Sequence, residues 1–183
     1  MVHLTNNCFQ NKHKDYKTKK DQTISAWSLI EEHIGKDKTQ VLSHEIKRIL
    51  LTTYAAANRK LIAKKGTYEL LGCDVIVDEN LKPYLLEVNT NPAMFTDTKT
   101  QKEMLPVLTR NTLDVALGLF ENENVEDYAE NSEKWGFELL YCEKTGFYYN
   151  LEGEKRSKVE MEDGECGFEV NGLVMSGERK ACK

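Results

Sequence analysis

The sequence lacks long apolar runs. No stretch approaches the roughly 18 apolar residues that a membrane-spanning helix needs. Residues 1–6 do not combine a basic start with a following apolar run, so they do not resemble a signal peptide. We therefore expect an intracellular soluble protein, and 183 residues, 40% of them hydrophobic, suffice for one globular domain with a small appendage.

Paired cysteines and glycine-rich phosphate loops are also missing. The five cysteines are scattered, and no two of them form a Cys-x-x-Cys pair. This pattern favours reduced thiols over a disulfide framework or a zinc site. No Gly-x-x-x-x-Gly-Lys segment is present either, so the sequence offers no phosphate-binding loop of that kind.

Basic charge is scarce in the last third of the chain. The 17 basic and 14 acidic residues of 1–120 give a net charge of +3, whereas the 8 basic and 16 acidic residues of 121–183 give −8. The acidic end argues against nucleic acid as a partner, because phosphate backbones bind basic surfaces. The basic runs at 12–20 and 59–65 are either a solvated loop and a helix end or a landing surface for an acidic polypeptide.

Three segments have the apolar spacing of amphipathic helices. The first spans 25–35, with Ser25 as its N-cap. The second spans 39–65, and the third covers about 98–120, where Pro106 should kink or interrupt it. The apolar residues expected in the core are Val41, Leu42, Ile46, Ile49, Leu50, Tyr54, Ala57, Leu61 and Ile62 in the second helix, and Leu105, Leu108, Leu113, Leu117 and Phe120 in the third.

Two strand-like runs lie between the second and third helices. They cover 67–77 and 84–89 and are separated by a polar stretch, as in a β-hairpin. A four-residue loop places Asp78 opposite Pro83 and sets the pairing of the two strands. Paired strands that alternate with helices predict a mixed α+β fold class.

The register that follows brings two carboxylates together. It places Asp74 opposite Glu87 and Ile76 opposite Leu85. Because side chains alternate along a strand, Asn89 shares the face of Glu87. The sequence therefore predicts three converging oxygen donors. The other face is expected to carry the core residues Leu71, Val75, Val77, Leu86 and Val88.

Facing carboxylates favour a metal site. Like charges opposite each other on paired strands are destabilising unless a cation lies between them. A donor set made only of oxygen is typical of Mg²⁺, which binds one or two carboxylates and keeps positions for water and phosphate. The alternative is an exposed acidic sheet face without a metal.

Three blocks of sequence resemble the tubulin tyrosine ligase-like family. They are His3–Asn6, Tyr68–Asp74 and Leu85–Ala93. Their order and spacing are similar to those of the family over residues 2–120. The last block, in which Asn-Pro-Ala follows Glu-x-Asn, is most similar to the polyglycylase branch.

The resemblance implies an ATP-grasp fold with ATP and Mg²⁺ as cofactors. It assigns Asp74, Glu87 and Asn89 as ligands of the magnesium ions that bridge the ATP phosphates, so these three residues also bind the nucleotide. Asn6 and Glu87 are the implied catalytic residues. Thr5 and Asn6 would face the ribose and phosphates from a neighbouring strand.

His3 and Lys12 remain open within the resemblance. His3 lies either beside the nucleotide or packed in the protein. Lys12 is a candidate contact to phosphate or acceptor, and the alternative is a mobile loop at 12–20.

The implied reaction joins an amino acid to a carboxylate of tubulin or another acidic protein through an acyl phosphate. Glycine is the amino acid on the closest resemblance, and glutamate or tyrosine is the alternative within the family. The other alternative is a catalytically inactive remnant that binds acidic cytoskeletal tails. The implied location is the cytoplasm and cytoskeleton, including a cilium or axoneme.

The two parts of the chain are expected to form separate regions. Residues 1–120 would be the C-terminal half of an ATP-grasp domain, so we expect a fragment with an incomplete ATP site. Residues 121–183 would be an acidic tail with an aromatic β-hairpin near 137–151. The remainder would be loosely packed, with one more short strand at 168–174.

Overall fold

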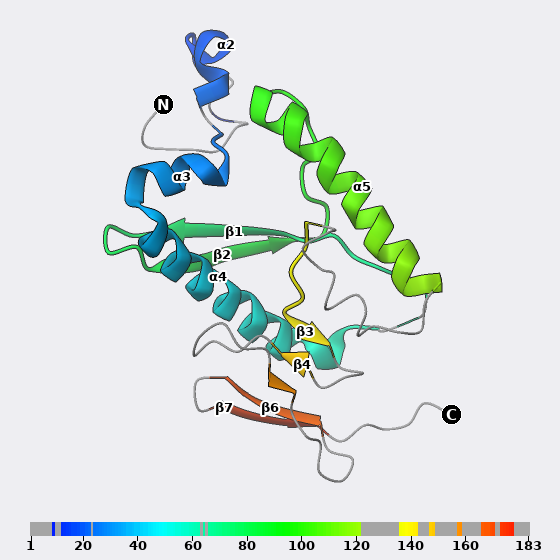
Figure 1. Ribbon diagram of the computed structural model, residues 1–183. Helices are drawn as coiled ribbons and strands as arrows, with labels where there is room; N and C mark the ends of the chain where they lie inside the picture. The colour runs from blue at the N-terminus through cyan, green and yellow to red at the C-terminus, as the bar shows by residue number, and fades with distance from the viewer. Residues whose placement is uncertain are drawn as a thin grey trace.

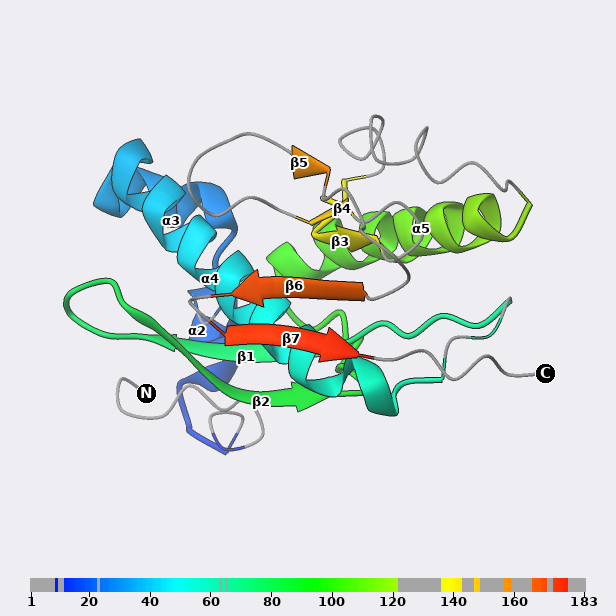
Figure 2. The same cartoon turned by 90° about the horizontal axis from the view of Figure 1, so that it is seen from below.

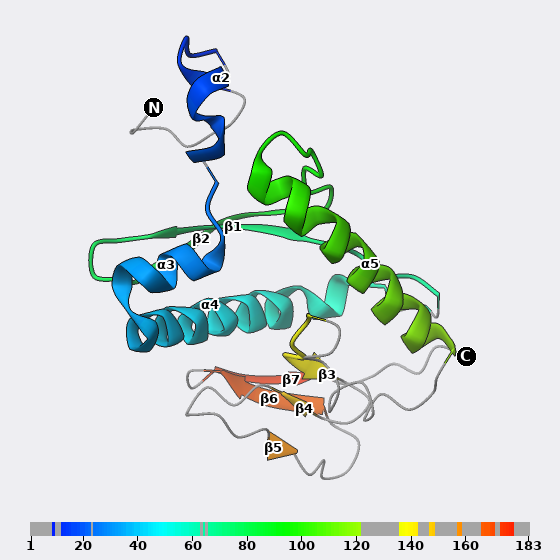
Figure 3. The same cartoon turned by 45° about the horizontal axis from the view of Figure 1, so that its top comes forward.

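The computed structural model is a mixed arrangement of helices and antiparallel strands, as the predicted α+β class requires. It describes residues 9, 12–22, 24–62, 64, 66–121, 136–142, 147–148, 157–158, 166–170 and 173–177. Helix α4 (Lys36–Ala57) packs against a hairpin of strands β1 (Gly72–Val77) and β2 (Pro83–Asn89). The hairpin lies on one side of α4, and the short strands of the tail lie on the other (Figures 1 and 3).

The chain before α4 forms short helices. Helix α2 (Tyr16–Lys19) continues into the 3-10 turn η1 (Lys20–Gln22), and α3 (Trp27–Ile34) follows. The predicted first helix is therefore present. Its predicted N-cap is wrong, because Ala26 occupies that position instead of Ser25 and no side chain caps the helix.

Gly35 ends α3 and begins α4. Its φ of 87° lies in the left-handed region that glycine adopts without a steric penalty. Its N–H donates to the Glu31 carbonyl oxygen at 2.9 Å, and its own carbonyl oxygen accepts from the Thr39 N–H at 3.1 Å. A single residue thus closes one helix and starts the next in a new direction (Figure 1).

Helix α4 ends before the predicted position. It stops at Ala57, the 3-10 turn η2 (Asn58–Lys60) follows, and the backbone of Leu61 is extended. The predicted extension to residue 65 is wrong because Leu61 and Ile62 are 54% and 88% exposed, so they bury no apolar face. Val41 is exposed as well. The buried residues of α4 are Thr39, Leu42, Leu51 and Ala55.

Helix α5 (Lys99–Glu121) runs through Pro106, so the predicted interruption is absent. A reciprocal cap stabilises its start: the Thr98 hydroxyl accepts from the Gln101 N–H at 3.2 Å, and Gln101 Oε1 accepts from the Thr98 N–H at 3.1 Å. The first N–H of the helix donates to Asp21 Oδ1 at 2.8 Å. These contacts attach the start of α5 to the N-terminal segment.

The core predicted on α5 is only partly buried. Leu105 is 6% exposed, whereas Leu113, Leu117 and Phe120 are 44%, 56% and 50% exposed. Those three residues line a cavity of about 460 Å³ together with the segment 66–68. Their predicted burial is wrong because this segment covers that side of the helix only in part.

The described parts of the tail form two small antiparallel sheets (Figure 2). Strands β3 (Tyr141–Cys142), β4 (Phe147–Tyr148) and β5 (Ser157–Lys158) make the first, and β3 pairs with β4 where the sequence predicts the aromatic hairpin. Strands β6 (Cys166–Val170) and β7 (Leu173–Gly177) make the second, in place of the single strand predicted there.

Two contacts hold the start of the tail against α4. Lys47 Nζ lies 2.7 Å from Glu138 Oε2, and the rings of Tyr54 and Tyr141 are 5.3 Å apart at their centroids.

Among the described helices, none is both long and apolar enough to cross a membrane.

Candidate metal and nucleotide site

Strands β1 and β2 carry the three predicted oxygen donors. Asp74 lies opposite Glu87, and Gly72 lies opposite Asn89. The predicted pairing of Asp74 with Glu87 is therefore confirmed. Because paired residues project to the same side of a sheet, the two carboxylates and the amide share one face. Both carboxylates are exposed, and Asn89 is half-buried.

A β-bulge at Leu86 interrupts the ladder. Between the turn and the bulge, Val75 pairs with Leu85 and Ile76 pairs with Tyr84. The register then shifts by one residue before Asp74. The predicted pairing of Asp78 with Pro83 is wrong, because Val77 pairs with Pro83 at the turn, and the predicted pairing of Ile76 with Leu85 is wrong by the same one residue.

The bulge decides which side chains face α4. If the register near the turn continued, Asp74 would lie opposite Leu86, and Glu87 would lie opposite Cys73 on the other face of the sheet. The extra residue returns Glu87 to the face of Asp74. It also reverses the predicted roles of two leucines, since Leu86 is 65% exposed and Leu85 lines the side of the hairpin next to α4.

The donor set on this face fits magnesium. The Asn89 side-chain amide nitrogen donates to Glu87 Oε1 at 3.2 Å, which holds the amide beside the carboxylate. Two carboxylates and an amide supply only oxygen ligands, and Mg²⁺ leaves its other positions to water and phosphate. In the described part of the chain, no three His, Cys, Asp or Glu side chains cluster as a metal site. The hairpin itself offers two carboxylates and one amide on this face.

Cys73 adds no anionic sulfur to the site. Burial raises the pKa of its thiol, and the negative charge of Asp74 raises that pKa further. The thiol is therefore protonated at neutral pH, whereas a metal binds the thiolate. Cys73 also pairs with Val88, on the face opposite to the carboxylates.

Asp78 fixes the turn between the strands. Its Oδ1 accepts from the N–H groups of Asn80 and Lys82 at 2.9 Å each, and the Tyr84 hydroxyl donates to its Oδ2 at 3.3 Å. The hydrogen bond from Lys82 is the largest cause that lowers the pKa of Asp78. Leu81 adopts a φ of 62°, which an unsupported loop would avoid.

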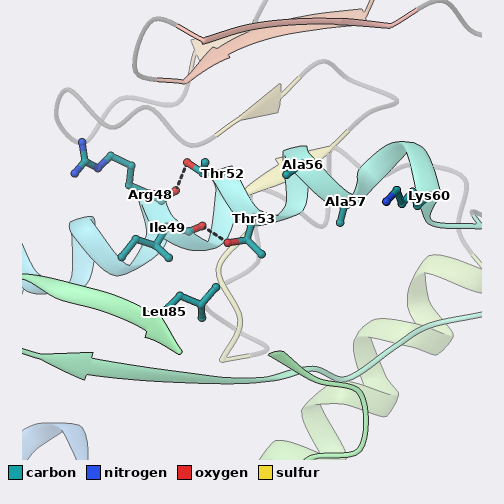
Figure 4. A pocket seen from close by; sticks show the side chains of 8 residues that line it. All are labelled: Arg48, Ile49, Thr52, Thr53, Ala56, Ala57, Lys60 and Leu85. Atoms are coloured by element: carbon teal, nitrogen blue, oxygen red, sulfur yellow. Dashed lines mark hydrogen bonds between the residues drawn. The ribbon is translucent and has the colours of Figure 1, made fainter. Parts of the chain in front are cut away.

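A separate cavity of about 650 Å³ lies on the other side of the hairpin, between α4 and β2 (Figure 4). The Thr52 and Thr53 hydroxyls donate to the carbonyl oxygens of Arg48 and Ile49 at 2.8 Å each, so they are committed to the helix. Leu85 points into this cavity from β2 (Figure 4). The candidate ligands project from the opposite face, so this cavity is not the carboxylate site. Its lining is Arg48, Ile49, Thr52, Thr53, Ala56, Ala57, Lys60 and Leu85.

Of the predicted site residues near the N-terminus, the described part of the chain includes Lys12 alone. His3, Thr5 and Asn6 lie outside the described residues. Lys12 is exposed in a turn before α2, where its N–H donates to the Phe9 carbonyl oxygen at 3.3 Å. No ion pair joins Lys12 to another described residue.

Sequence reasoning missed Gly72. This residue lies opposite Asn89 at the end of the ladder, and Pro92 approaches it closely. The available signal was a glycine inside a strand pattern, which often marks a close approach of another part of the chain.

Comparison with known proteins identifies relatives of the chain. The model of the tubulin-tyrosine ligase family matches residues 1–125. "Protein polyglycylase TTLL10" of Macaca fascicularis is 35% identical over 130 residues, which are 65% of this chain and 21% of the relative. "Inactive polyglycylase TTLL10" of Homo sapiens is 34% identical over 129 residues, covering 64% and 19%. "Probable tubulin polyglutamylase TTLL9" of Rattus norvegicus is 25% identical over 189 residues, covering 99% and 36%.

The hairpin with its facing carboxylates, and the long helix on which it packs, lie within the residues that this family model matches. The chain belongs to the tubulin-tyrosine ligase family. It spans about a fifth of the length of the polyglycylases that it matches. No solved structure is a significant match to it.

Proposed function

We propose that the chain is the C-terminal part of an ATP-grasp catalytic domain that ligates an amino acid to carboxylates of tubulin or another acidic protein, with ATP and Mg²⁺. One observation carries the proposal: Asp74 lies opposite Glu87, with Asn89 hydrogen-bonded to Glu87 on the same face. Membership of the tubulin-tyrosine ligase family supports it.

Asp74, Glu87 and Asn89 would hold the magnesium through their oxygen atoms. When bound, Mg²⁺ neutralises phosphate charge and orients the transferred phosphoryl group. The β-ladder fixes the two carboxylates opposite each other before a cation arrives. Cation binding would therefore relieve their mutual repulsion.

The proposed reaction has two steps. An oxygen of the acceptor carboxylate attacks the γ-phosphorus of ATP, ADP leaves, and an acyl phosphate forms. The amino group of the incoming amino acid then attacks the acyl carbon, phosphate leaves, and the amine loses a proton to solvent as the amide forms. The three hairpin residues contribute by orienting the phosphates, because positioning and charge stabilisation supply most of the catalysis in phosphoryl transfer.

Glycine is the proposed amino acid, with Thr5, Asn6 and Lys12 as further proposed contacts to the nucleotide. The polyglycylase of Macaca fascicularis and the inactive polyglycylase of Homo sapiens are 35% and 34% identical to the chain, whereas polyglutamylases of Rattus norvegicus and Bos taurus are 25% and 29% identical. Glutamate remains the alternative on the strength of these polyglutamylases. The cytoskeleton, including the axoneme, is the proposed location because these polyglutamylases are named for tubulin.

Binding without catalysis is the second candidate function. The human relative is named an inactive polyglycylase, and Lys17 and Lys19 in the last turn of α2 are both exposed. In this alternative, acidic cytoskeletal tails bind the surface of α2, and the protein does not catalyse the ligation of an amino acid.

An amino acid incorporation assay distinguishes the candidates. The full-length protein is incubated with tubulin, ATP, Mg²⁺ and labelled glycine or labelled glutamate. We expect ATP-dependent incorporation of glycine, a loss of about 100-fold or more in Asp74→Ala, and retained activity in Glu79→Gln, a matched loss of charge in the exposed turn. Absence of incorporation in the unmodified protein supports the binding function, and an active Asp74→Ala variant overturns the assignment of the site.

A further inference from the structure

Pro92 occupies the space that a side chain at Gly72 would need. A Cβ atom built on Gly72 would lie 2.9 Å from the Cβ and 3.6 Å from the Cα of Pro92. The nearer distance is too short for two carbon atoms, and these atoms belong to a backbone-linked ring that cannot rotate away. Any larger residue at position 72 would therefore move the chain at Pro92.

The requirement for glycine at this position is steric and not conformational. The described glycines with positive φ are Gly35, Gly66 and Gly136, so Gly72 has a backbone that other residues adopt. Glycine inside a strand is unfavourable relative to alanine. The close approach of Pro92 is the physical reason that the structure gives for a glycine here.

The contact lies on the face of the candidate ligands. The same Cβ position on Gly72 is 3.9 Å from the Cβ of Asn89, its partner in the ladder. Asp74 is two residues further along the strand and projects to the same side. Pro92 therefore packs on the carboxylate face, and the segment from Asn89 to Pro92 turns back onto the hairpin.

A short, stiff connection transmits the position of Pro92 to Asn89. Only two residues separate them, proline fixes its own φ, and Asn91 is restricted to extended backbone because it precedes a proline. Asn89 in turn donates its amide hydrogen to Glu87 at 3.2 Å. A shift at Pro92 therefore reaches the amide that completes the donor set.

We propose that Gly72 is a positioning residue for the candidate site: by leaving space for Pro92, it sets the path of the chain after Asn89 and holds that amide beside Glu87. The expected effect of Gly72 on metal binding rests on the proposed function. Its geometric part, the control of Asn89 by the contact between Gly72 and Pro92, is independent of any metal.

Two backgrounds at position 92 isolate the contact. Pro92→Ala keeps the Cβ that a methyl group at position 72 would meet, whereas Pro92→Gly removes it. The 183-residue chain is prepared with Gly72→Ala alone, with each change at position 92 alone, and with both combinations. The readouts are the NMR resonance of the Asn89 side-chain amide in metal-free protein and the dissociation constant for Mn²⁺, used as a probe for Mg²⁺.

We expect Gly72→Ala to shift the Asn89 amide resonance and to weaken Mn²⁺ binding about tenfold, as loss of a supporting contact does. The same change should persist in the Pro92→Ala background and vanish in the Pro92→Gly background. An unchanged Asn89 resonance in Gly72→Ala, or equal effects in the two backgrounds, overturns the proposal.

Two further outcomes are decisive. If Gly72→Ala does not fold, Pro92→Gly alone removes the contact from the other side, and an unchanged Asn89 resonance there overturns the proposal. If the unmodified chain binds no Mn²⁺ and Asp74→Ala changes nothing, the metal site fails. In that case the NMR comparison in metal-free protein still decides the role of Gly72.

Discussion

Single side chains in the β1–β2 turn hold the candidate ligands in register. Asp78 accepts hydrogen bonds from two backbone N–H groups of its own loop and from the Tyr84 hydroxyl. The conformation of a hairpin loop determines which residues face each other along the strands. The pairing of Asp74 with Glu87 therefore depends on the turn as well as on the bulge.

Asp78→Ala should lower thermal stability at neutral pH and lose this effect in acid. The hydrogen bonds lower the pKa of Asp78 in the folded state. Its contribution is therefore fully present above the unfolded-state pKa of about 3.9 and is lost as the pH falls through the lower folded-state pKa. Thermal unfolding of the variant and the unmodified chain, compared from about pH 7 downward, measures this difference.

Glu79→Ala is the control for that experiment, because Glu79 is the exposed neighbour of Asp78 in the same turn. It should show no such pH dependence. A deficit in Asp78→Ala that stays constant into acid would mean that the carboxylate charge does not support the turn.

At the scale of elements, the β-bulge assigns opposite environments to two adjacent leucines. Leu85→Ala should lower the free energy of unfolding by about 1–2 kcal/mol, less than for a fully buried leucine, because Leu85 is half-buried against α4. Leu86→Ala should change it by less than about 0.5 kcal/mol, because Leu86 is 65% exposed. Urea denaturation measures both changes, and a larger loss in Leu86→Ala would show that the bulge is elsewhere in solution.

The hairpin could be predicted from sequence because its two strand-like runs flank a polar turn, and this pattern is local. The bulge could not be predicted, because the residue types of β2 do not show which of its residues is left unpaired. The pairing of Asp74 with Glu87 was nevertheless correct, because the bulge offsets a one-residue error in the predicted turn, whereas Ile76 lies between the turn and the bulge and keeps that error. The contact of Gly72 with Pro92 depends on the path of the chain beyond the strand, which residue spacing does not encode.

The helices show the same limit. Leu61 and Ile62 continue the apolar spacing of α4 in sequence, yet they lie beyond its end and are exposed. In α5, the predicted start near residue 98 was correct, but the continuous helix through Pro106 was not expected. Periodicity marks where a helix is favourable, and the available packing partners decide where it ends.

At the scale of the whole molecule, the arrangement of layers leaves the carboxylate face open. Helix α4 and the tail strands lie on one side of the hairpin (Figure 3). Asp74 and Glu87 project from the other side and are exposed. Both carboxylates are therefore accessible to the proposed phosphates, with Pro92 packed at the Gly72 end of the same face.

The charge of the molecule bears on the proposed acidic acceptor. Reversing the charge of the exposed Lys17 and Lys19 to glutamate should weaken binding of a glutamate-rich peptide roughly threefold to tenfold at low salt, since exposed ion pairs are individually weak and screened by salt. Fluorescence anisotropy measures the affinity. Reversal of Lys36 and Lys38, which are equally basic and exposed on α4, is the matched control, and an equal loss in both variants would contradict a defined landing surface.

Thermal unfolding of the 183-residue chain during titration with Mg²⁺ tests the central claim most directly. Without metal, Glu87→Gln should be more stable than the unmodified chain by up to about 1 kcal/mol, because it removes one of two facing charges. Added Mg²⁺ should stabilise the unmodified chain and Glu79→Gln in proportion to its binding, and should leave Glu87→Gln unchanged. Equal stabilisation of Glu87→Gln and the unmodified chain, or none in either, would contradict a cation site between Asp74 and Glu87.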